Sequence, residues 1–324
     1  MSEEKNKDEG IQGGPQNSLA GLVAPLEVSQ FLGEHYQLRP AVLRGSADRA
    51  RGLVSLRAIV DMASGGGVPA GRLLADGDAI RSATAPSPDF AAAIDGGIKP
   101  GTERIWGYLE AGRVLVWNSA RGATPALDRL CADIGAALGA AVWPNIYVTG
   151  SAGAPIVAHF DGHEVIAIQC EGQKEWTVSA TRVPEPLDGP SFKEENKRTA
   201  AALREEAALR PEIIATLQPG DAIYVPRGQF HQARAVDGIS VHVTLGIEHL
   251  TGMTVMEVLT QAAAEDPRFR ASLPSVAMDP DRALMRARLT ELSEALRAMA
   301  CTEELVGTMV KLEGELAGRG ARRD

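Results

Sequence analysis

Short apolar segments separated by turn residues fill the middle of this 324-residue chain and constrain its fold more than any other feature. Gly, Pro and Asp bound the segments, and several of them alternate apolar with polar side chains, the two-residue period of a strand. Many short strands of this kind are typical of an antiparallel sandwich or small barrel. The predicted strands are residues 114–117, 141–148, 164–170, 175–178, 213–217, 222–225 and 239–247.

Helical patterns surround the predicted strands. Residues 27–35 and 55–63 carry apolar side chains at the spacing of amphipathic helices, and residues 192–210, rich in Glu, Lys, Arg and Ala, predict a helical insert. After about residue 251 the strand pattern stops. We therefore expect a mainly β core with N-terminal helices and a C-terminal helical module. The predicted helices of that module are residues 254–264, 281–300 and 302–316.

Three regions follow from this pattern. Residues 1–18 are polar and lack the apolar core of a signal peptide, so they predict a disordered tail. Residues 19–250 form one domain of helices and strands, and residues 251–324 form the helical module. The longest apolar runs are far too short to cross a bilayer, so no membrane association is expected.

Composition limits the partners and the compartment. The net charge of −9, without a dense Lys/Arg block, disfavours direct nucleic-acid binding and is compatible with a basic peptide or protein partner. Cys131, Cys170 and Cys301 lack pair spacing, which argues against a disulfide framework or a zinc knuckle. A reducing cytoplasm is therefore the expected location.

One group of side chains has metal-ligand character. His159 and Asp161 are two residues apart, so a strand that held both would place them on one face. His231 follows a turn, a buried apolar strand and a loop, and could supply a third ligand from a neighbouring strand. Two imidazoles and one carboxylate leave three coordination positions open, which suits non-haem Fe(II). A His-x-Asp pair by itself is common in proteins without a metal site.

Two longer segments carry a resemblance. "WPNIYVTGSAGAPIVAHFDGHEVIAIQCEGQKEWTV" and "LQPGDAIYVPRGQFHQA…SVHVTLGI" lie between about residues 144 and 247, roughly a third of the chain. They resemble the JmjC-type, cupin-4 branch of Fe(II)/2-oxoglutarate dioxygenases, the group that contains the ribosomal oxygenases. The resemblance implies a double-stranded β-helix, also called the cupin or JmjC barrel. Residues 251–274 resemble the dimerisation segment of that group, so we expect a homodimer; the alternative is that the helical module covers the barrel of its own chain.

The same resemblance implies roles for individual residues. His159, Asp161 and His231 correspond to the iron ligands, and Lys174 corresponds to the cation that pairs with the distal carboxylate of 2-oxoglutarate. A dry pocket requires such a fixed positive charge; an exposed turn lysine is the alternative for Lys174, and Arg227 is the alternative cation. Three further positions correspond to residues that line the co-substrate pocket: Asn145, Tyr147 and Thr244.

Other candidates carry a weaker pattern. His163 is a second-shell or entrance candidate, and His242 on the last predicted strand could face either side; a hydrogen-bonded core or rim histidine is the simpler interpretation of both. Trp143 and Trp176 are interpreted as packing residues. Gly246 stands where the resembling family often has serine, so the resemblance does not imply the contact that this serine makes with the co-substrate. The tail shows no convincing strand pair, so a complete winged-helix module is not expected.

The implied activity is hydroxylation of an amino-acid side chain in a protein or peptide, with Fe(II) as metal and 2-oxoglutarate as co-substrate. A ribosomal protein and a ribosomally made peptide both fit as substrate. Two other classes stay open: a metal-binding cupin of non-oxygenase chemistry, such as an isomerase, and a catalytically silent barrel that acts as a binding module. Lys174 with Asn145 and Tyr147 argues against the isomerase, and the intact ligand set argues against the silent barrel.

Overall fold

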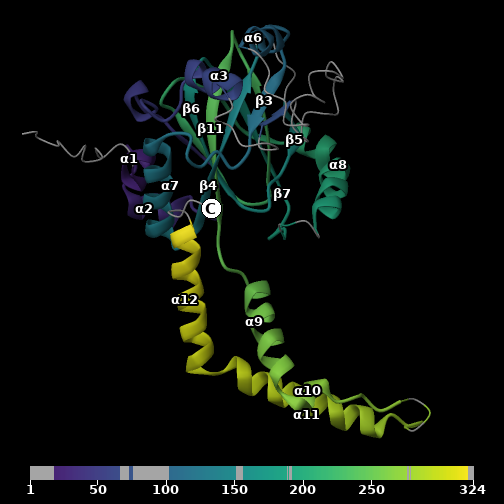
Figure 1. Ribbon diagram of the computed structural model, residues 1–324. Coiled ribbons are helices and arrows are strands. Elements are labelled where there is room, and N and C mark those ends of the chain that lie inside the picture. The colour runs from purple at the N-terminus through teal and green to yellow at the C-terminus, as the bar shows by residue number, and fades with distance from the viewer. Residues whose placement is uncertain are drawn as a thin grey trace, which may run out of the picture.

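Two antiparallel sheets form the core of the protein in the computed structural model (Figure 1). The seven-stranded sheet contains, in spatial order, β1 (Ala41–Leu43), β9 (Ala222–Val225), β6 (Glu164–Glu171), β11 (Ser240–Glu248), β4 (Ala141–Thr149), β3 (Val114–Trp117) and β2 (Leu73–Ala75). The four-stranded sheet contains β5 (Ile156–His159), β10 (Gln229–Ala235), β7 (Lys174–Arg182) and β8 (Pro211–Leu217). The structure describes residues 18–65, 73–75, 102–150, 156–187, 189, 192–275, 277 and 279–319.

This arrangement is the double-sheeted jelly roll that the sequence predicts, and neighbouring strands in both sheets pair antiparallel. Strands β3 and β9 have the bounds that the apolar runs predict, and the other predicted strands lie within one to four residues of theirs. The expected tail at residues 1–18 lies outside the described residues except for Ser18, whose hydroxyl accepts a hydrogen bond from the Gly21 amide and caps helix α1.

Helices cover the sheets on both sides. Helices α1 (Leu19–Val23) and α2 (Val28–Glu34) precede β1 in the chain. A 3₁₀ turn at Ala47–Arg49, α3 (Leu56–Gly65) and α6 (Thr102–Glu110) lie between β1 and β3. Between strands lie α7 (Pro125–Leu138) and the predicted insert α8 (Lys193–Leu209), which packs on β5 and β7. The tail contains α9 (Gly252–Glu265), α10 (Pro267–Arg270), α11 (Ala283–Ala300) and α12 (Glu303–Arg319), and its described residues include no strand.

Helix α7 is absent from the sequence-based expectation, although its ends have clear signals. The Thr124 hydroxyl accepts a hydrogen bond from the Leu127 amide, and Pro125 stands in the first turn, where its missing amide proton costs nothing. Gly139 ends the helix at φ 60°, a conformation that favours glycine. These signals lie in the caps of the helix and not in the apolar periodicity that predicts the other helices.

The seven-stranded sheet has an outer face that packs in the main core and an inner face that lies toward the four-stranded sheet. Along β11, alternate residues from Val241 to Ile247 are buried in the main core, together with Val142 and Val148 of β4. Helices α1, α3 and α7 contribute to the same core. The two-residue period therefore directs the intervening side chains of β4 and β11 to the inner face, between the two sheets.

The tail forms an arm that projects from one end of the β core (Figure 1). Helix α9 leads away from the core, α11 extends outward, and α12 returns to pack against α7 and β4. Among the described residues, no helix is both long and apolar enough to cross a lipid bilayer.

Candidate active site

Neighbouring strands of the four-stranded sheet bring the predicted metal ligands together. His159 is the last residue of β5 and is the register partner of His231 on β10, with ring centroids 4.4 Å apart. Asp161 lies beyond the end of β5, so the strand pleat does not align the pair as the two-residue spacing would. Phe160 is buried and packs on Phe230, and the chain bends at residues 162–163. The Asp161 carbonyl accepts a hydrogen bond from the Gly228 amide.

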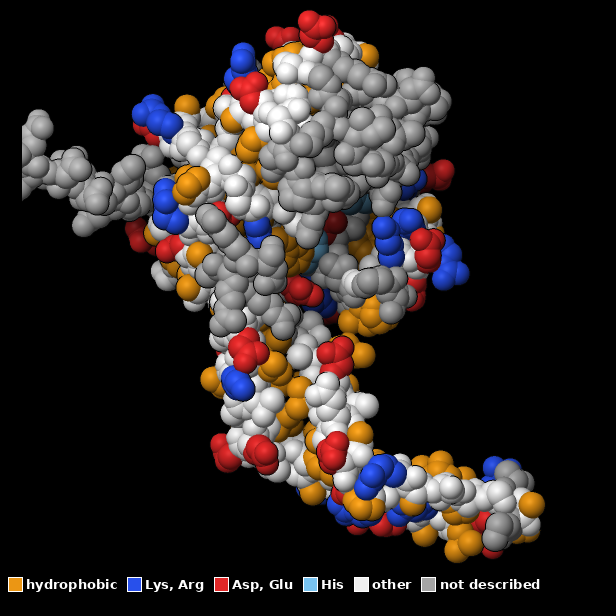
Figure 2. Space-filling model, in the orientation of Figure 1, with side chains coloured by type: hydrophobic (Ala, Val, Ile, Leu, Met, Phe, Trp, Pro, Cys, Tyr) orange, Lys and Arg blue, Asp and Glu red, His pale blue; other side chains and the backbone are white. Residues whose placement is uncertain are grey.

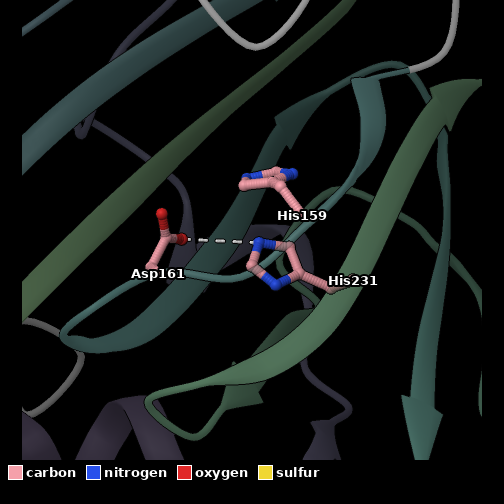
Figure 3. Close-up of side chains that lie close together, drawn as sticks. All are labelled: His159, Asp161 and His231. Atoms are coloured by element: carbon pink, nitrogen blue, oxygen red, sulfur yellow. Dashed lines mark ion pairs between the residues drawn. The ribbon is translucent and has the colours of Figure 1, made fainter. Parts of the chain in front are cut away.

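One potential ligand atom from each of these three residues lies within 4.8 Å of the others. Oδ2 of Asp161 and Nε2 of His231 are 3.5 Å apart, and Figure 3 shows the two imidazoles and the carboxylate converging on one point. Atoms that each bind one metal ion at about 2.0–2.2 Å lie a few ångströms from one another, as these atoms do. The geometry therefore fits a single metal ion held by His159, Asp161 and His231.

Hydrogen bonds hold both imidazoles in a ligating orientation. Nδ1 of His159 lies 2.8 Å from the Val157 carbonyl oxygen, and Nδ1 of His231 lies 3.0 Å from the Gln229 carbonyl oxygen. With its proton on Nδ1, each imidazole donates a hydrogen bond to that carbonyl, and the lone pair of Nε2 is free to bind a metal. This is the usual arrangement around metal-binding histidines.

Protonation at neutral pH also suits a metal. Burial, followed by the nearby His159, lowers the pKa of His231 to about 4, so His231 is neutral. Burial alone acts to raise the pKa of Asp161, but the imidazoles of His159, His163 and His231 bring it below its ordinary value. The site therefore offers neutral nitrogen and anionic oxygen before a metal enters.

A buried lysine occupies the same interior. Gly172 turns the chain between β6 and β7 at φ 63°, and a Cβ there would lie 2.3 Å from the Ile239 carbonyl oxygen. The turn starts β7 at Lys174, whose exposed fraction is 0%. Burial lowers the pKa of Lys174 to about 7. Its interior position excludes the alternative of an exposed turn lysine.

The partners of Lys174 are neutral. Its Nζ donates to Oγ1 of Thr149 at 2.8 Å and lies 3.2 Å from Nδ1 of His242, whose pKa burial holds well below its ordinary value. Within the described part of the chain, no ion pair joins Lys174 to a carboxylate. A buried ammonium with two neutral partners is an incomplete site, and an anionic ligand would complete it.

The other predicted co-substrate residues share the inner face of the large sheet. Asn145 and Tyr147 lie two residues apart on β4, and Thr244 is the register partner of Asn145 on β11. The ring of Tyr147 stacks on that of His242 at 4.8 Å and 8°. Oδ1 of Asn145 accepts a hydrogen bond from the Ser119 amide at 2.8 Å, which fixes the side-chain amide.

Two further residues of this interior contact Lys174. The sequence assigns no role to Thr149, and His242 is the buried, hydrogen-bonded histidine that the simpler interpretation predicts. The alternation along β4 and β11 could have found them, because Thr149 continues the series Asn145, Tyr147, and His242 precedes Thr244 by two. Only the cross-strand register shows that these two series face Lys174.

Trp176 packs beside one predicted metal ligand and beside the histidine that contacts Lys174. It is buried, as the packing interpretation expects, with its ring 5.9 Å from that of His231 and 5.6 Å from that of His242. A cavity of about 870 Å³ lies outside the site, between the barrel and the tail. Gly162 and His163 line it from the barrel and Met253 from α9. In Figure 2 histidine surface lies in a hollow above the arm.

Arg227, the alternative cation, belongs to this outer cavity. Its guanidinium pairs with Glu185 at 2.7 Å, and it lines the cavity between the barrel and the tail. Lys174, in contrast, lies in the interior, where its Nζ contacts Thr149 and His242.

Comparisons with known proteins find similar sequences and similar folds. Residues 119–255 match the model of the JmjC domain family. Ribosomal oxygenase 1 of Rattus norvegicus is 30% identical over 185 residues, covering 54% of this chain and 29% of that protein. Ribosomal oxygenase 2 of Bos taurus is 30% identical over 178 residues, covering 52% and 35%. The chain thus spans about a third of the length of these relatives.

The fold has solved neighbours. The crystal structure of Escherichia coli ribosomal oxygenase YcfD superposes with a TM-score of 0.53 at 17% identity, over 86% of this chain and 68% of that one. YcfD in complex with cobalt and 2-oxoglutarate superposes equally well, with a TM-score of 0.53 at 16% identity over 87% and 69%. At this identity the likeness concerns the fold. Over residues 119–255 this chain is similar to the JmjC domain family, and it resembles the ribosomal oxygenases in sequence and fold.

Proposed function

We propose that this protein is an Fe(II)- and 2-oxoglutarate-dependent oxygenase that hydroxylates an amino-acid side chain of a protein or peptide. The observation that carries the proposal is the pairing of two incomplete sites in one interior. The His159–Asp161–His231 triad has the composition of an open iron site, and Lys174 is a buried cation that lacks a counter-ion among the described residues. A dicarboxylate that also chelates the metal completes both sites.

The residues present fit the metal. His159 and His231 would supply imidazole nitrogens and Asp161 a carboxylate oxygen, a facial set that leaves coordination positions for a chelating ligand and O₂. Fe(II) with 2-oxoglutarate and O₂ supplies oxidative decarboxylation of the co-substrate, which yields succinate and CO₂ and inserts one oxygen atom into a C–H bond.

Residues of the chain would bind and orient the 2-oxoglutarate. Lys174, positioned by Thr149 and His242, would pair with the distal carboxylate of 2-oxoglutarate. Tyr147 and Asn145 would line the co-substrate, each fixed by a neighbour. The buried rings of Trp176 and His242 exclude water from the space between the two sites.

A protein side chain is the proposed substrate. The relatives include the bifunctional lysine-specific demethylase and histidyl-hydroxylase NO66 of Drosophila pseudoobscura pseudoobscura, 26% identical over 282 residues that cover 84% of this chain and 28% of that protein. The similarity to ribosomal oxygenases and to this hydroxylase supports a ribosomal protein or another polypeptide as target. His163, two residues after Asp161, lines the outer cavity, where such a polypeptide would bind.

The test uses anaerobically purified protein. We would incubate it with Fe(II), 2-oxoglutarate and a peptide pool prepared from lysate, admit O₂, and search by mass spectrometry for species heavier by one oxygen atom. Wild-type protein should produce them together with succinate, and Asp161→Ala, which removes the one anionic ligand, should produce neither. A wild-type protein that fails to bind Fe(II) and 2-oxoglutarate refutes the proposal.

We also propose that residues 251–324 are a dimerisation module and that the protein is a cytoplasmic homodimer. The arm exposes apolar side chains along its length, including Met256, Leu289 and Val310 at 47%, 50% and 63% exposure. Helix α12 caps α7 and β4 of its own chain, but these side chains need a second surface. The three cysteines are free, which supports a reducing compartment.

A further inference from the structure

One predicted metal ligand, His159, lies on an edge strand. Its strand, β5, has four residues, and β10 is the one strand that pairs with it among the described residues. His231 lies on β10 between two strands, opposite His159 of β5 and Val178 of β7. The register of β5 against β10 also shifts between His231 and Ala233. Strand pairing therefore holds His231 from both sides and His159 from one.

Helix α8, the insert between β7 and β8, packs on β5 as well as on β7 (Figure 1). Ala200 and Ala207 are seven residues apart and lie on one face of the helix. They are buried together with Ala158 and Phe160, the two residues that flank His159 in the chain. Alanine side chains are small, so the helix lies close to the segment that carries the metal ligand.

A hydrogen bond ties the helix directly to this segment. Nε of Arg204 on α8 donates to the carbonyl oxygen of Ala158 at 3.2 Å. The preceding carbonyl, that of Val157, lies 2.8 Å from Nδ1 of His159. Two successive carbonyls of β5 are therefore engaged. One orients the imidazole, and the other holds the backbone beside it against α8.

The end of α8 is anchored without Arg204. The carbonyl oxygen of Arg210, the residue after the helix, accepts hydrogen bonds from the Ala180 amide at 2.7 Å and from the Ser179 hydroxyl at 3.0 Å. Both donors lie on β7. Removing the Arg204 donor should therefore leave the helix on β7 and release the backbone of β5.

We infer that α8 is a clamp that positions His159 for the metal, with Arg204 as the positioning residue. A ligand that is already held in place binds without the cost of being ordered, so a looser β5 lowers the affinity for the metal. This inference rests on the proposed function. It adds to that function a residue outside the site that sets the metal affinity.

The test measures Co(II) binding by absorption titration, without turnover. Arg204→Met keeps the aliphatic stem and removes the donor, so the affinity should fall by about two- to tenfold, the range for one hydrogen bond. Arg204→Gln places an N–H the same number of bonds from the backbone and should stay within about twofold of wild type. Arg198→Met, at an exposed arginine of the same helix, is the matched control and should bind as wild type does.

A double-mutant cycle separates positioning of His159 from a general effect on the fold. If Arg204 acts through His159, then Arg204→Met should change the Co(II) affinity of the His159→Ala protein by less than about 1.5-fold. A loss as large as in wild type would overturn the inference. So would equal Co(II) affinities of wild type and Arg204→Met. A wild type that binds no Co(II) would instead refute the proposed function.

A second variant tests the clamp from the helix side and decides the question if Arg204→Met fails to fold. Ala200→Leu adds atoms where α8 meets β5, so it should push the two apart and lower the Co(II) affinity. Ala201→Leu, at the exposed neighbouring position, is its control and should not. Equal affinities of these two proteins, both folded by circular dichroism, would overturn the inference.

Discussion

Nζ of Lys174 lies 3.2 Å from Nδ1 of His242 in an interior that exposes neither side chain by more than 1%. Burial holds the pKa of His242 well below its ordinary value, so the imidazole is neutral. Its Nδ1 accepts a hydrogen bond from the ammonium of Lys174. The ring of Tyr147 stacks on the same imidazole. The pair therefore holds the ammonium in a fixed position, ready for an anion, before any ligand enters.

Removal of this ammonium should weaken 2-oxoglutarate binding. Truncating one partner of a buried charge pair costs on the order of 2–5 kcal/mol, so Lys174→Ala should lower the affinity by tens to thousands of fold. Isothermal titration of the Mn(II)-loaded protein measures this. Arg227→Ala is the matched control, because that cation pairs with Glu185 in the outer cavity, and it should bind 2-oxoglutarate as wild type does. The reverse result would assign the carboxylate to Arg227.

The affinity for 2-oxoglutarate should depend on pH through Lys174. Its pKa in the free protein is about 7, and a bound carboxylate favours the charged form and raises that pKa. Affinity should therefore be level below pH 7 and fall as pH rises above it, by up to about tenfold per pH unit. Lys174→Arg, which stays charged, should abolish this fall; a wild-type affinity that is flat from pH 7 to pH 9 would contradict the prediction.

The same lysine should destabilise the free protein at neutral pH. The pKa of Lys174 falls from 10.5 to about 7 on folding, so the unfolded chain binds more protons between these values. The destabilisation is full below pH 7 and fades as pH rises toward 10.5. Lys174→Met, which keeps the length of the chain without its charge, should raise the melting temperature at pH 7, with about 2–4 °C for each kcal/mol gained. Addition of 2-oxoglutarate and Mn(II) should stabilise wild type more than this variant.

A buried polar network joins the barrel to the N-terminal helices. The Tyr224 hydroxyl donates to Oε2 of Glu164 and accepts from the Gln37 amide at 2.6 Å. Glu164→Ala leaves that buried hydroxyl without its acceptor, so it should lower the free energy of unfolding by about 1–3 kcal/mol in urea denaturation. Glu164→Gln keeps an acceptor oxygen and should cost less. Equal stabilities of the alanine variant and wild type would show that water or another group replaces the carboxylate.

The proposed dimer predicts a sharp difference between two surface variants. Light scattering of wild type at micromolar concentration should give twice the chain mass of 34.2 kDa. Leu289→Lys places a charge on the arm and should shift the protein toward monomer, whereas Ile214→Lys on β8, at a similarly exposed site, should leave the dimer intact. A clean wild-type monomer would rule out the dimer and leave α12 as a cap of its own chain.

Local patterns determined much of this protein from the sequence. The apolar runs at residues 114–117 and 222–225 predict strands β3 and β9 at their observed bounds, and the helical periodicity after residue 251 predicts the helices of the arm. The turn before Lys174 was also expected. These features depend on residues a few positions apart, which is why side-chain spacing and turn residues are enough to predict them.

Tertiary structure alone decided the rest. The spacing of His159 and Asp161 did not show that the strand ends between them, or that cross-strand pairing sets His231 opposite His159. Nothing local to Lys174 shows that Thr149 and His242 enclose it, because they lie on two other strands. Register and depth arise from contacts between distant segments, and a one-residue shift in pairing would turn these side chains out of the interior.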